Sequence, residues 1–151
     1  MIKSSLSAII KQLPESDFRS RCQALCDLLR SINPKYDWIG IYWVDGDQLT
    51  LGPWTGDQPT EHVRIPIDKG ICGAAVREQQ TIIVDDVNAD PRYLSCFTHT
   101  KSEIVVPIYA DGLIIGEIDI DGKGIGDFDA SDKNFLEEVA VLIGREWPGR
   151  W

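Results

Sequence analysis

The chain has 151 residues, of which 43% are hydrophobic and 26% charged, a composition typical of a globular protein, and we expect residues 1–151 to form one domain. Its formal charge of −9 argues against binding to nucleic acid or to an anionic membrane, because both require a basic surface. No stretch approaches the about 18–20 apolar residues of a membrane span, and Lys11 and Gln12 interrupt the first apolar run, so no signal peptide is predicted.

The N-terminal part of the chain predicts two helices. A short helix is expected over residues 4–12. A longer helix follows the N-cap candidate Ser16, with Asp17 in its first turn, and ends at Asn33-Pro34. The apolar residues of the longer helix recur at helical spacing, at Phe18, Cys22, Leu25, Leu29 and Ile32.

The middle of the chain favours strands. Residues 37–44 are mainly aromatic and β-branched, and Asp45-Gly46 after them is a pair typical of a tight hairpin turn, so residues 48–54 are expected to form the second strand. A third strand is expected near residues 62–67. From Gly70 onward the small residues of ICGAAVRE predict a helix.

A long connection follows this helix. A short strand is expected at residues 81–84, and residues 85–102 then contain many turn-forming residues, with one helical turn expected around 91–95. Connections of this length inside a compact domain are usually functional or disordered.

The C-terminal part of the chain predicts a second hairpin and a last helix. The hairpin joins residues 103–109 and 113–121 across Asp111-Gly112, and Ser131 is the expected N-cap of the helix. The predicted fold class is therefore α+β. It is a mainly antiparallel sheet with the terminal helices on one face and the short middle helix and long loop over the other, leaving a pocket beneath the loop.

The four cysteines fall into two groups. A cytoplasmic protein is expected, so the cysteines are reduced core residues, metal ligands or redox-active thiols rather than disulfides. Cys22 and Cys26 lie four residues apart on one helix and are interpreted as core, because a metal site would need further ligands. Cys72 lies at a helix start, where a thiol pKa can be lowered, although close packing alone would explain it. Cys96 lies in the long loop and is less easily explained as core.

The acidic residues are concentrated in one segment, since residues 111–132 contain seven acids and one base. Glu117, Asp119 and Asp121 alternate with isoleucines, so all three share one face of a strand. Glu103 begins the neighbouring strand. A solvated face is the commoner cause of such alternation, and the alternative is a pocket whose carboxylates hold a cationic ligand.

The aromatic residues and histidines carry weaker signals. Trp38 and Tyr42 share one strand face and are interpreted mainly as core. Trp38 is also a candidate pocket wall, because Gly40 leaves space beside it. His62 and His99 are isolated in the sequence, and surface or structural roles are expected for both.

Together these segments resemble the GAF-domain family of free methionine-(R)-sulfoxide reductases. The resemblance runs from about Asp37 to Asp129, and the helix-flanked antiparallel sheet predicted above is the fold that it implies. It is carried by the motifs DWIGIYW, LGPWTG, KGICGAAV, IIVDDVNADPRYLSC, TKSEIVVPI and GEIDID.

The resemblance implies a thiol-dependent reaction. A cysteine attacks the sulfur of free methionine-(R)-sulfoxide, methionine leaves, and the resulting sulfenic acid condenses with a second cysteine to a disulfide that thioredoxin reduces. Cys96 and Cys72 match two redox positions of the family and are taken as nucleophile and resolving thiol, or in the reverse roles.

The resemblance also implies a binding site. Glu103, Asp119 and Asp121 match family positions that bind the substrate or assist proton transfer, and Trp38 matches a residue that walls the methyl group. A carboxyl group with a raised pKa can protonate the leaving sulfoxide oxygen.

The chain departs from the family pattern at one cysteine. Family members with the full pattern carry a third cysteine ten residues before the position of Cys72, where this chain has His62. If that third cysteine is the efficient resolving partner, turnover is impaired here. His62 is an accessory candidate, since its charge could favour a neighbouring thiolate.

Three hypotheses remain. The first is a free methionine-(R)-sulfoxide reductase that uses thioredoxin as external reductant, binds no cofactor or metal, and forms a homodimer. The second is a non-catalytic GAF module that binds a small amino-acid-like or redox ligand, and the third is a dimerisation module. Trp147 and Trp151, near the C-terminus, either contribute to an interface or fold back on the domain.

Overall fold

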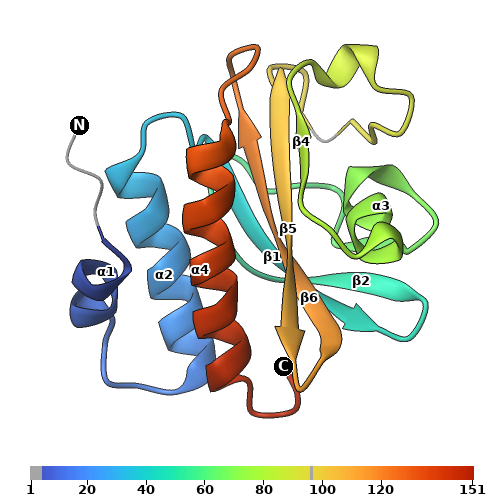
Figure 1. Ribbon diagram of the computed structural model, residues 1–151. Helices are drawn as coiled ribbons and strands as arrows, with labels where there is room; N and C mark the ends of the chain where they lie inside the picture. Colours follow the sequence, from blue (N-terminus) through green and yellow to red (C-terminus); the bar gives the residue numbers. More distant parts are fainter. Residues whose placement is uncertain (1–4, 96) are drawn as a thin grey trace.

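The computed structural model describes residues 5–95 and 97–151. Within them, six strands form one antiparallel sheet in the order β3-β2-β1-β6-β5-β4. Helices α1, α2 and α4 cover one face, and α3 with the loop after β4 covers the other (Figure 1), which confirms the predicted α+β fold. The elements are α1 Leu6–Gln12, α2 Phe18–Ile32, β1 Trp38–Asp45, β2 Gln48–Thr55, β3 Arg64–Pro66, α3 Gly70–Glu78, β4 Ile82–Val84, η1 Val87–Ala89, β5 Ser102–Ala110, β6 Leu113–Gly122 and α4 Ala130–Glu146.

Two tight turns build the predicted hairpins of the sheet. Gly46 joins β1 to β2 with a φ of +62°. Asp111 and Gly112 join β5 to β6 with φ of 51° and 77°, the left-handed backbone that a two-residue hairpin turn requires. The two hairpins meet where β1 pairs with β6, so Trp38 lies opposite Asp121 and Gly40 opposite Asp119.

The helix starts differ from the sequence prediction by one or two residues. Asp17, not Ser16, caps α2, because its carboxylate accepts a hydrogen bond from the backbone N–H of Ser20 at 2.8 Å. Asp129, not Ser131, caps α4, and it forms a reciprocal capping box with Asp132. In both cases a carboxylate in the extended residue before the helix satisfies the free N–H groups of the first turn.

The helical turn of the long connection lies earlier in the sequence than predicted. The turn is η1, with the Asp86 side chain accepting from Asn88 N–H, whereas residues 91–95 form no helix. The turn lies where the chain leaves β4, because the carboxylate of Asp86 stabilises it locally.

Each face of the sheet has its own hydrophobic core. The core beneath α1, α2 and α4 contains Cys22 and Cys26, which are 3% and 1% exposed; both are free thiols, which confirms their interpretation as core. The core beneath α3 contains Trp38, Tyr42 and Cys72. Within residues 5–95 and 97–151, every helix is too short or too polar to cross a lipid bilayer.

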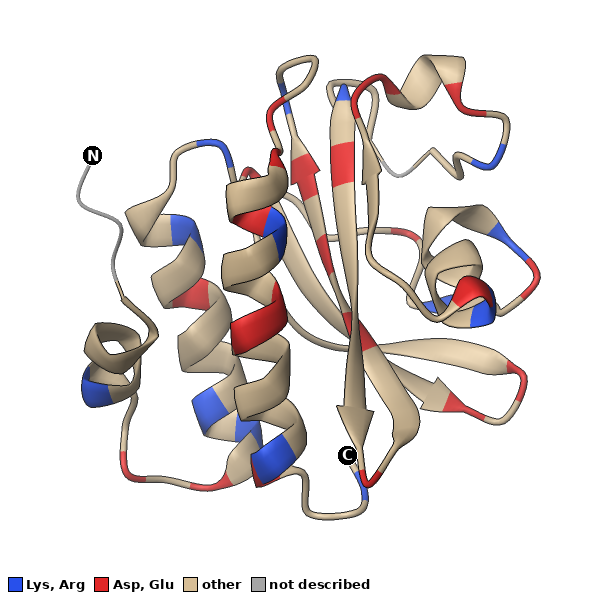
Figure 2. Cartoon of the chain, in the orientation of Figure 1, with Lys and Arg blue, Asp and Glu red and all other residues tan. Residues whose placement is uncertain are grey.

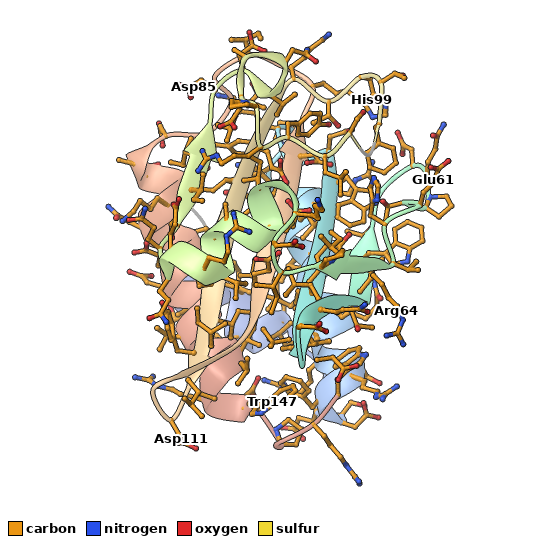
Figure 3. The ribbon with its side chains drawn as sticks, turned by 90° about the vertical axis from the view of Figure 1, so that its right-hand side faces the viewer. Glu61, Arg64, Asp85, His99, Asp111 and Trp147 are labelled. Carbon is orange, nitrogen blue, oxygen red and sulfur yellow. The ribbon has the colours of Figure 1, made fainter. Side chains whose placement is uncertain are left out.

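The C-terminal tryptophans fold back on the same domain. The ring of Trp43 lies 4.9 Å from that of Trp147 and 5.0 Å from that of Trp151, measured between ring centroids. Trp147 lies at the end of the molecule opposite His99 (Figure 3). The aromatic cluster is therefore remote from the loop that covers the second core.

Candidate active site

The alternating carboxylates of β6 are buried. Glu117, Asp119 and Asp121 are 0%, 1% and 2% exposed, and Glu103 of β5, the register partner of Asp121, is 5% exposed. Figure 2 shows red bands of acidic residues on the strands β5 and β6. The interpretation of this strand face as solvated is wrong, because α3 and the following loop cover it.

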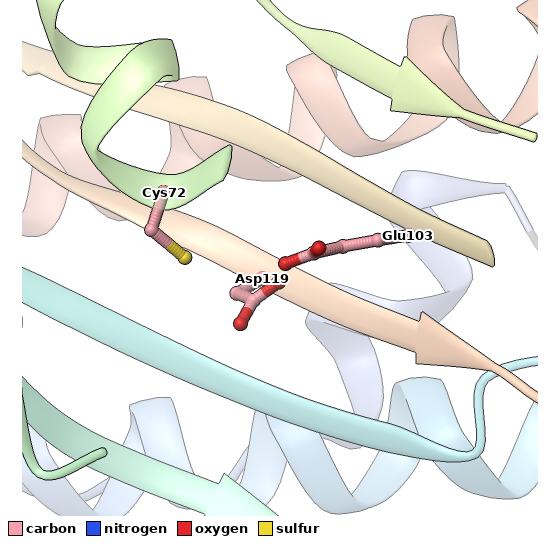
Figure 4. A group of neighbouring side chains, drawn as sticks. All are labelled: Cys72, Glu103 and Asp119. Carbon is pink, nitrogen blue, oxygen red and sulfur yellow. The ribbon is translucent and has the colours of Figure 1, made fainter. Parts of the chain in front are cut away.

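Glycines allow α3 to lie close to the segment that follows β3. Gly70 starts the helix with a φ of +69°, a backbone conformation that residues other than glycine rarely adopt. A Cβ on Gly73 would lie 2.3 Å from the carbonyl oxygen of Ile67, so only glycine fits this approach. The result is that Cys72, in the first turn of α3, points its thiol at the carboxylates (Figure 4).

Cys72, Glu103 and Asp119 form a compact cluster. The Cys72 sulfur, one oxygen of Glu103 and one oxygen of Asp119 all lie within 4.8 Å of one another. These residues come from α3, β5 and β6, and all three are buried. The structure thus brings together groups that the sequence separates by up to 47 positions.

The thiol of Cys72 is held in its neutral form. Burial raises its pKa well above the usual value, and the nearby carboxyls of Asp119, Glu117 and Glu103 raise it further. The interpretation in which the start of the helix lowers this pKa is therefore wrong, because burial and negative neighbours outweigh the helix dipole.

The buried carboxyls also favour their protonated forms. Burial raises the pKa of Glu117 and Asp121 well above the usual range and raises that of Asp119, while the nearby Cys72 thiol favours the ionised forms of Glu117 and Asp119. Among the described residues, neither Glu117 oxygen, nor Asp119 Oδ1, nor Asp121 Oδ2 has a hydrogen-bond partner of standard geometry. Such groups can donate a proton, and a bound cation would stabilise their charge.

Trp38 belongs to the same hydrophobic core as Cys72. Its ring stacks on Trp54 at 6.3 Å and contacts Phe97 at 6.0 Å, measured between ring centroids. A Cβ on Gly40 would lie 2.3 Å from the Trp38 ring. The space expected beside Gly40 is therefore filled by Trp38 itself.

His62 lies at the edge of the site and contacts the covering loop. Its Nε2–H donates to the carbonyl oxygen of Ser95 at 2.8 Å, and its own carbonyl accepts from the Tyr42 hydroxyl at 2.7 Å. Its charge also favours the ionised form of Asp119. Cys96, the predicted nucleophile, lies outside the described residues.

The space inside the site is small. A cavity of about 10 Å³ remains between the cluster and the loop, which is room for about one water molecule. A larger hollow of about 430 Å³ at the end of α2 contains no cysteine, so size alone does not identify the site. The small cavity is lined by Ile65, Gly70, Ile71, Cys72, Leu94, Glu103 and Asp119.

Glu117 belongs to this site but was not among the residues predicted to form it. Glu117 is fully buried and is one of the carboxyls that raise the pKa of Cys72. The signal for it was present, because Glu117 belongs to the same strict alternation as Asp119 and Asp121. The register β1–β6, which places it opposite Tyr42, was needed to show that it lies beneath α3.

Comparison with known proteins identifies related sequences. A family profile of the GAF domain matches residues 15–145. The free methionine-R-sulfoxide reductase of Saccharomyces cerevisiae is 40% identical over 120 residues, covering 77% of this chain and 66% of that protein. The Escherichia coli enzyme of the same name is 36% identical over 107 residues, covering 71% and 64%. The match thus spans slightly less than two thirds of either protein.

Solved structures show the same relationship. The type II free methionine-R-sulfoxide reductase from Thermoplasma acidophilum superposes with a TM-score of 0.83 at 40% identity, covering 85% of this chain and 91% of that one. The free methionine-R-sulfoxide reductase from Neisseria meningitidis, in complex with its substrate, gives 0.86 at 33% identity, covering 93% and 84%.

Proposed function

The chain belongs to the GAF-domain family, and we propose that it reduces free methionine-(R)-sulfoxide to methionine. The observation that carries this proposal is the buried cluster of Cys72, Glu103 and Asp119, with their donor atoms within 4.8 Å of one another. The choice of substrate is supported by relatives named for this activity, which are 33–40% identical to this chain. The cluster supplies a thiol and proton donors suited to that chemistry.

The first step needs a thiolate and an acid. The Cys96 sulfur attacks the sulfoxide sulfur, and a neighbouring protonated carboxyl delivers a proton to the sulfoxide oxygen. The oxygen then transfers to the Cys96 sulfur as the sulfur–oxygen bond of the substrate and the transient sulfur–sulfur bond both break, so methionine leaves and Cys96 becomes a sulfenic acid. The raised pKa of Asp119 suits the role of acid, because a carboxyl must be protonated to donate.

The second step uses the neutral thiol of Cys72. The Cys72 sulfur displaces the oxygen of the Cys96 sulfenic acid, which leaves as water with the thiol proton, and a disulfide forms. The raised pKa of Cys72 supports its assignment as resolving thiol, because the attacking thiol of the first step must be a thiolate. Thioredoxin then reduces the disulfide, so the cycle needs no bound cofactor or metal and suits the reducing cytoplasm.

Substrate binding needs the covering loop to move. A cavity of about 10 Å³ cannot hold an amino acid, so Leu94 and its neighbours must shift outward. The ammonium group would then be held by Asp121 and Glu103, and the methyl group would lie against Trp38. A homodimer through the outer faces of α2 and α4 remains part of this proposal, without Trp147 and Trp151, which pack on Trp43.

A thioredoxin-coupled assay with the free R sulfoxide tests the activity. We expect turnover by the full chain, none above background with Cys96→Ser, and none with the S sulfoxide. Cys26→Ala removes a thiol buried in the other core and is the matched control, which should retain turnover. Absence of turnover by the unaltered chain, under conditions where thioredoxin itself is active, would disprove the proposal.

One observation favours the alternative of a non-catalytic ligand-binding module. The site is closed and its thiol is neutral, features that also suit a GAF domain whose loop opens only to bind a small ligand. Saturable binding of methionine sulfoxide, measured by calorimetry and accompanied by no turnover in the assay above, would favour this alternative.

A further inference from the structure

The cluster of Cys72, Glu103 and Asp119 has the composition of a metal site. We propose that these three side chains bind a zinc ion, with the fourth coordination position left to solvent. They offer one sulfur and two carboxylate oxygens from three different elements, all within 4.8 Å of one another. Three protein ligands with an open fourth position are a common arrangement for zinc.

The distances need only a small adjustment. Zinc lies about 2.3 Å from a thiolate sulfur and about 2.0–2.2 Å from a carboxylate oxygen. Donor atoms that share one ion are therefore somewhat closer than the 4.8 Å limit that holds here. The proposal requires the Glu103 and Asp119 side chains to rotate by that difference while the backbone of α3 and of the sheet stays in place.

A second observation points independently to a ligand. Asp119 is 1% exposed, and its Oδ1 has no hydrogen-bond partner among the described residues. A buried polar atom without a partner costs free energy, and a cation bound to this carboxylate would remove that cost.

The donor set and the cavity favour zinc over other ions. A thiolate with carboxylates suits a borderline-soft ion, whereas calcium and magnesium take oxygen donors alone. The cavity of about 10 Å³ can accept a single ion while Leu94 and the rest of the loop stay in place. Zinc therefore fits the closed form of the site, and an amino acid does not.

Zinc binding is an exchange of protons for an ion. The sulfur–hydrogen bond of Cys72 breaks, its proton goes to solvent, and a zinc–sulfur bond forms without oxidation. A protonated carboxyl of the cluster loses its proton in the same way. Bound zinc would thus block the thiol that resolves the sulfenic acid, so we expect reversible inhibition; this consequence rests on the proposed function, whereas binding itself does not.

The test measures zinc binding in a Cys96→Ser background of the full chain, by competition with a chromogenic zinc indicator and without a thiol reductant. We expect one zinc ion per chain. Adding Cys72→Ser should weaken binding by roughly 100-fold or more, since even residues that only support metal ligands contribute about 10–100-fold. Asp119→Asn keeps the thiol and should also weaken binding, by at least tenfold.

The control removes a different thiol. Cys26→Ala in the same background alters the core on the other face of the sheet and should leave the affinity for zinc within a few-fold. The proposal is wrong if Cys72→Ser and Cys26→Ala bind zinc equally well while circular dichroism shows both to be folded. Cobalt in place of zinc adds a second readout, a thiolate-to-cobalt absorption band that Cys72→Ser should abolish. Because Cys96→Ser is inactive by design, failure of the proposed activity and failure of zinc binding are observed separately.

Discussion

At the scale of single residues, His62 links the edge of the site to the covering loop. Its hydrogen bond to Ser95 fixes the backbone of the residue immediately before Cys96 in the sequence. Its charge also favours the ionised form of Asp119. We therefore expect His62 to act as a positioning residue in the proposed reaction.

Replacement of His62 tests this role. His62→Ala should lower kcat/KM about 2- to 10-fold, the equivalent of one lost hydrogen bond of roughly 0.5–1.5 kcal/mol. His62→Gln can still donate to the Ser95 carbonyl and should recover most of the loss. Steady-state kinetics of the unaltered chain and of both variants measure this difference. An equal loss of kcat/KM in both variants would show that the hydrogen bond to Ser95 does not contribute to the reaction.

The burial of the carboxylates illustrates the limit of residue-level prediction. The period of two along β6 correctly placed Glu117, Asp119 and Asp121 on one face. That pattern states only which residues share a face. Whether the face is solvated depends on α3 and the loop, which approach from segments distant in the sequence, so a local pattern could not decide between a wet face and a pocket.

At the scale of elements, the start of α4 has a specific cap. The Asp129 carboxylate accepts from the backbone N–H of Ser131 and of Asp132, at 2.8 and 3.1 Å, and Asp132 in return accepts from Asp129 N–H at 3.0 Å. Asp132 also accepts from the Tyr36 hydroxyl at 2.8 Å, which ties the helix start to the segment between α2 and β1. This cap therefore supports packing as well as the helix itself.

Removal of the cap should be measurable. Asp129→Ala should lower the free energy of unfolding by about 1 kcal/mol, within a usual range of roughly 0.5–2 kcal/mol. Ser131→Ala, at the residue that the sequence favoured as cap, should change it by less than about 0.5 kcal/mol. Urea denaturation of both variants measures the difference. The reverse order of effects would mean that Ser131 caps the helix in solution.

The elements themselves were largely predictable from local signals. Asp45-Gly46 and Asp111-Gly112 determine the hairpins because few other residues adopt the required backbone. The helix caps were missed because Ser16 and Asp17 are both suitable residue types, and only the backbone direction selects between them. For the same reason the helical turn of the long connection was predicted around residues 91–95, whereas it lies at Val87–Ala89.

At the scale of the whole molecule, the sheet separates two cores of different character. The core beneath α1, α2 and α4 is apolar. The core beneath α3 contains Trp38 and Tyr42 together with the buried carboxyls of β5 and β6. Burial of ionisable groups lowers the stability of the folded protein when they must carry charge, so the second core makes the stability of the whole domain depend on pH.

The sign of this dependence follows from the raised pKa values. Glu117 and Asp121 have pKa values in the folded protein well above the usual range, which for an unfolded glutamate is about 4.3. Between the unfolded and folded values, the folded protein binds more protons than the unfolded chain. The contribution of these two groups to the free energy of unfolding is therefore greatest below the unfolded pKa and is lost as the pH rises through the folded pKa.

Glu117→Gln removes one of these groups and should reduce the decrease in the free energy of unfolding as the pH rises. Its free energy of unfolding, relative to the unaltered chain, should rise with pH above about 4.3, by at most about 1.4 kcal/mol per pH unit for a single group. Urea denaturation at a series of pH values gives both curves. Asp111→Asn makes the same change of charge at an exposed turn residue and should run parallel to the unaltered chain. If the Glu117→Gln curve also ran parallel, the pKa of Glu117 would be the same in the folded and unfolded protein, and burial would not hold this carboxyl in its protonated form.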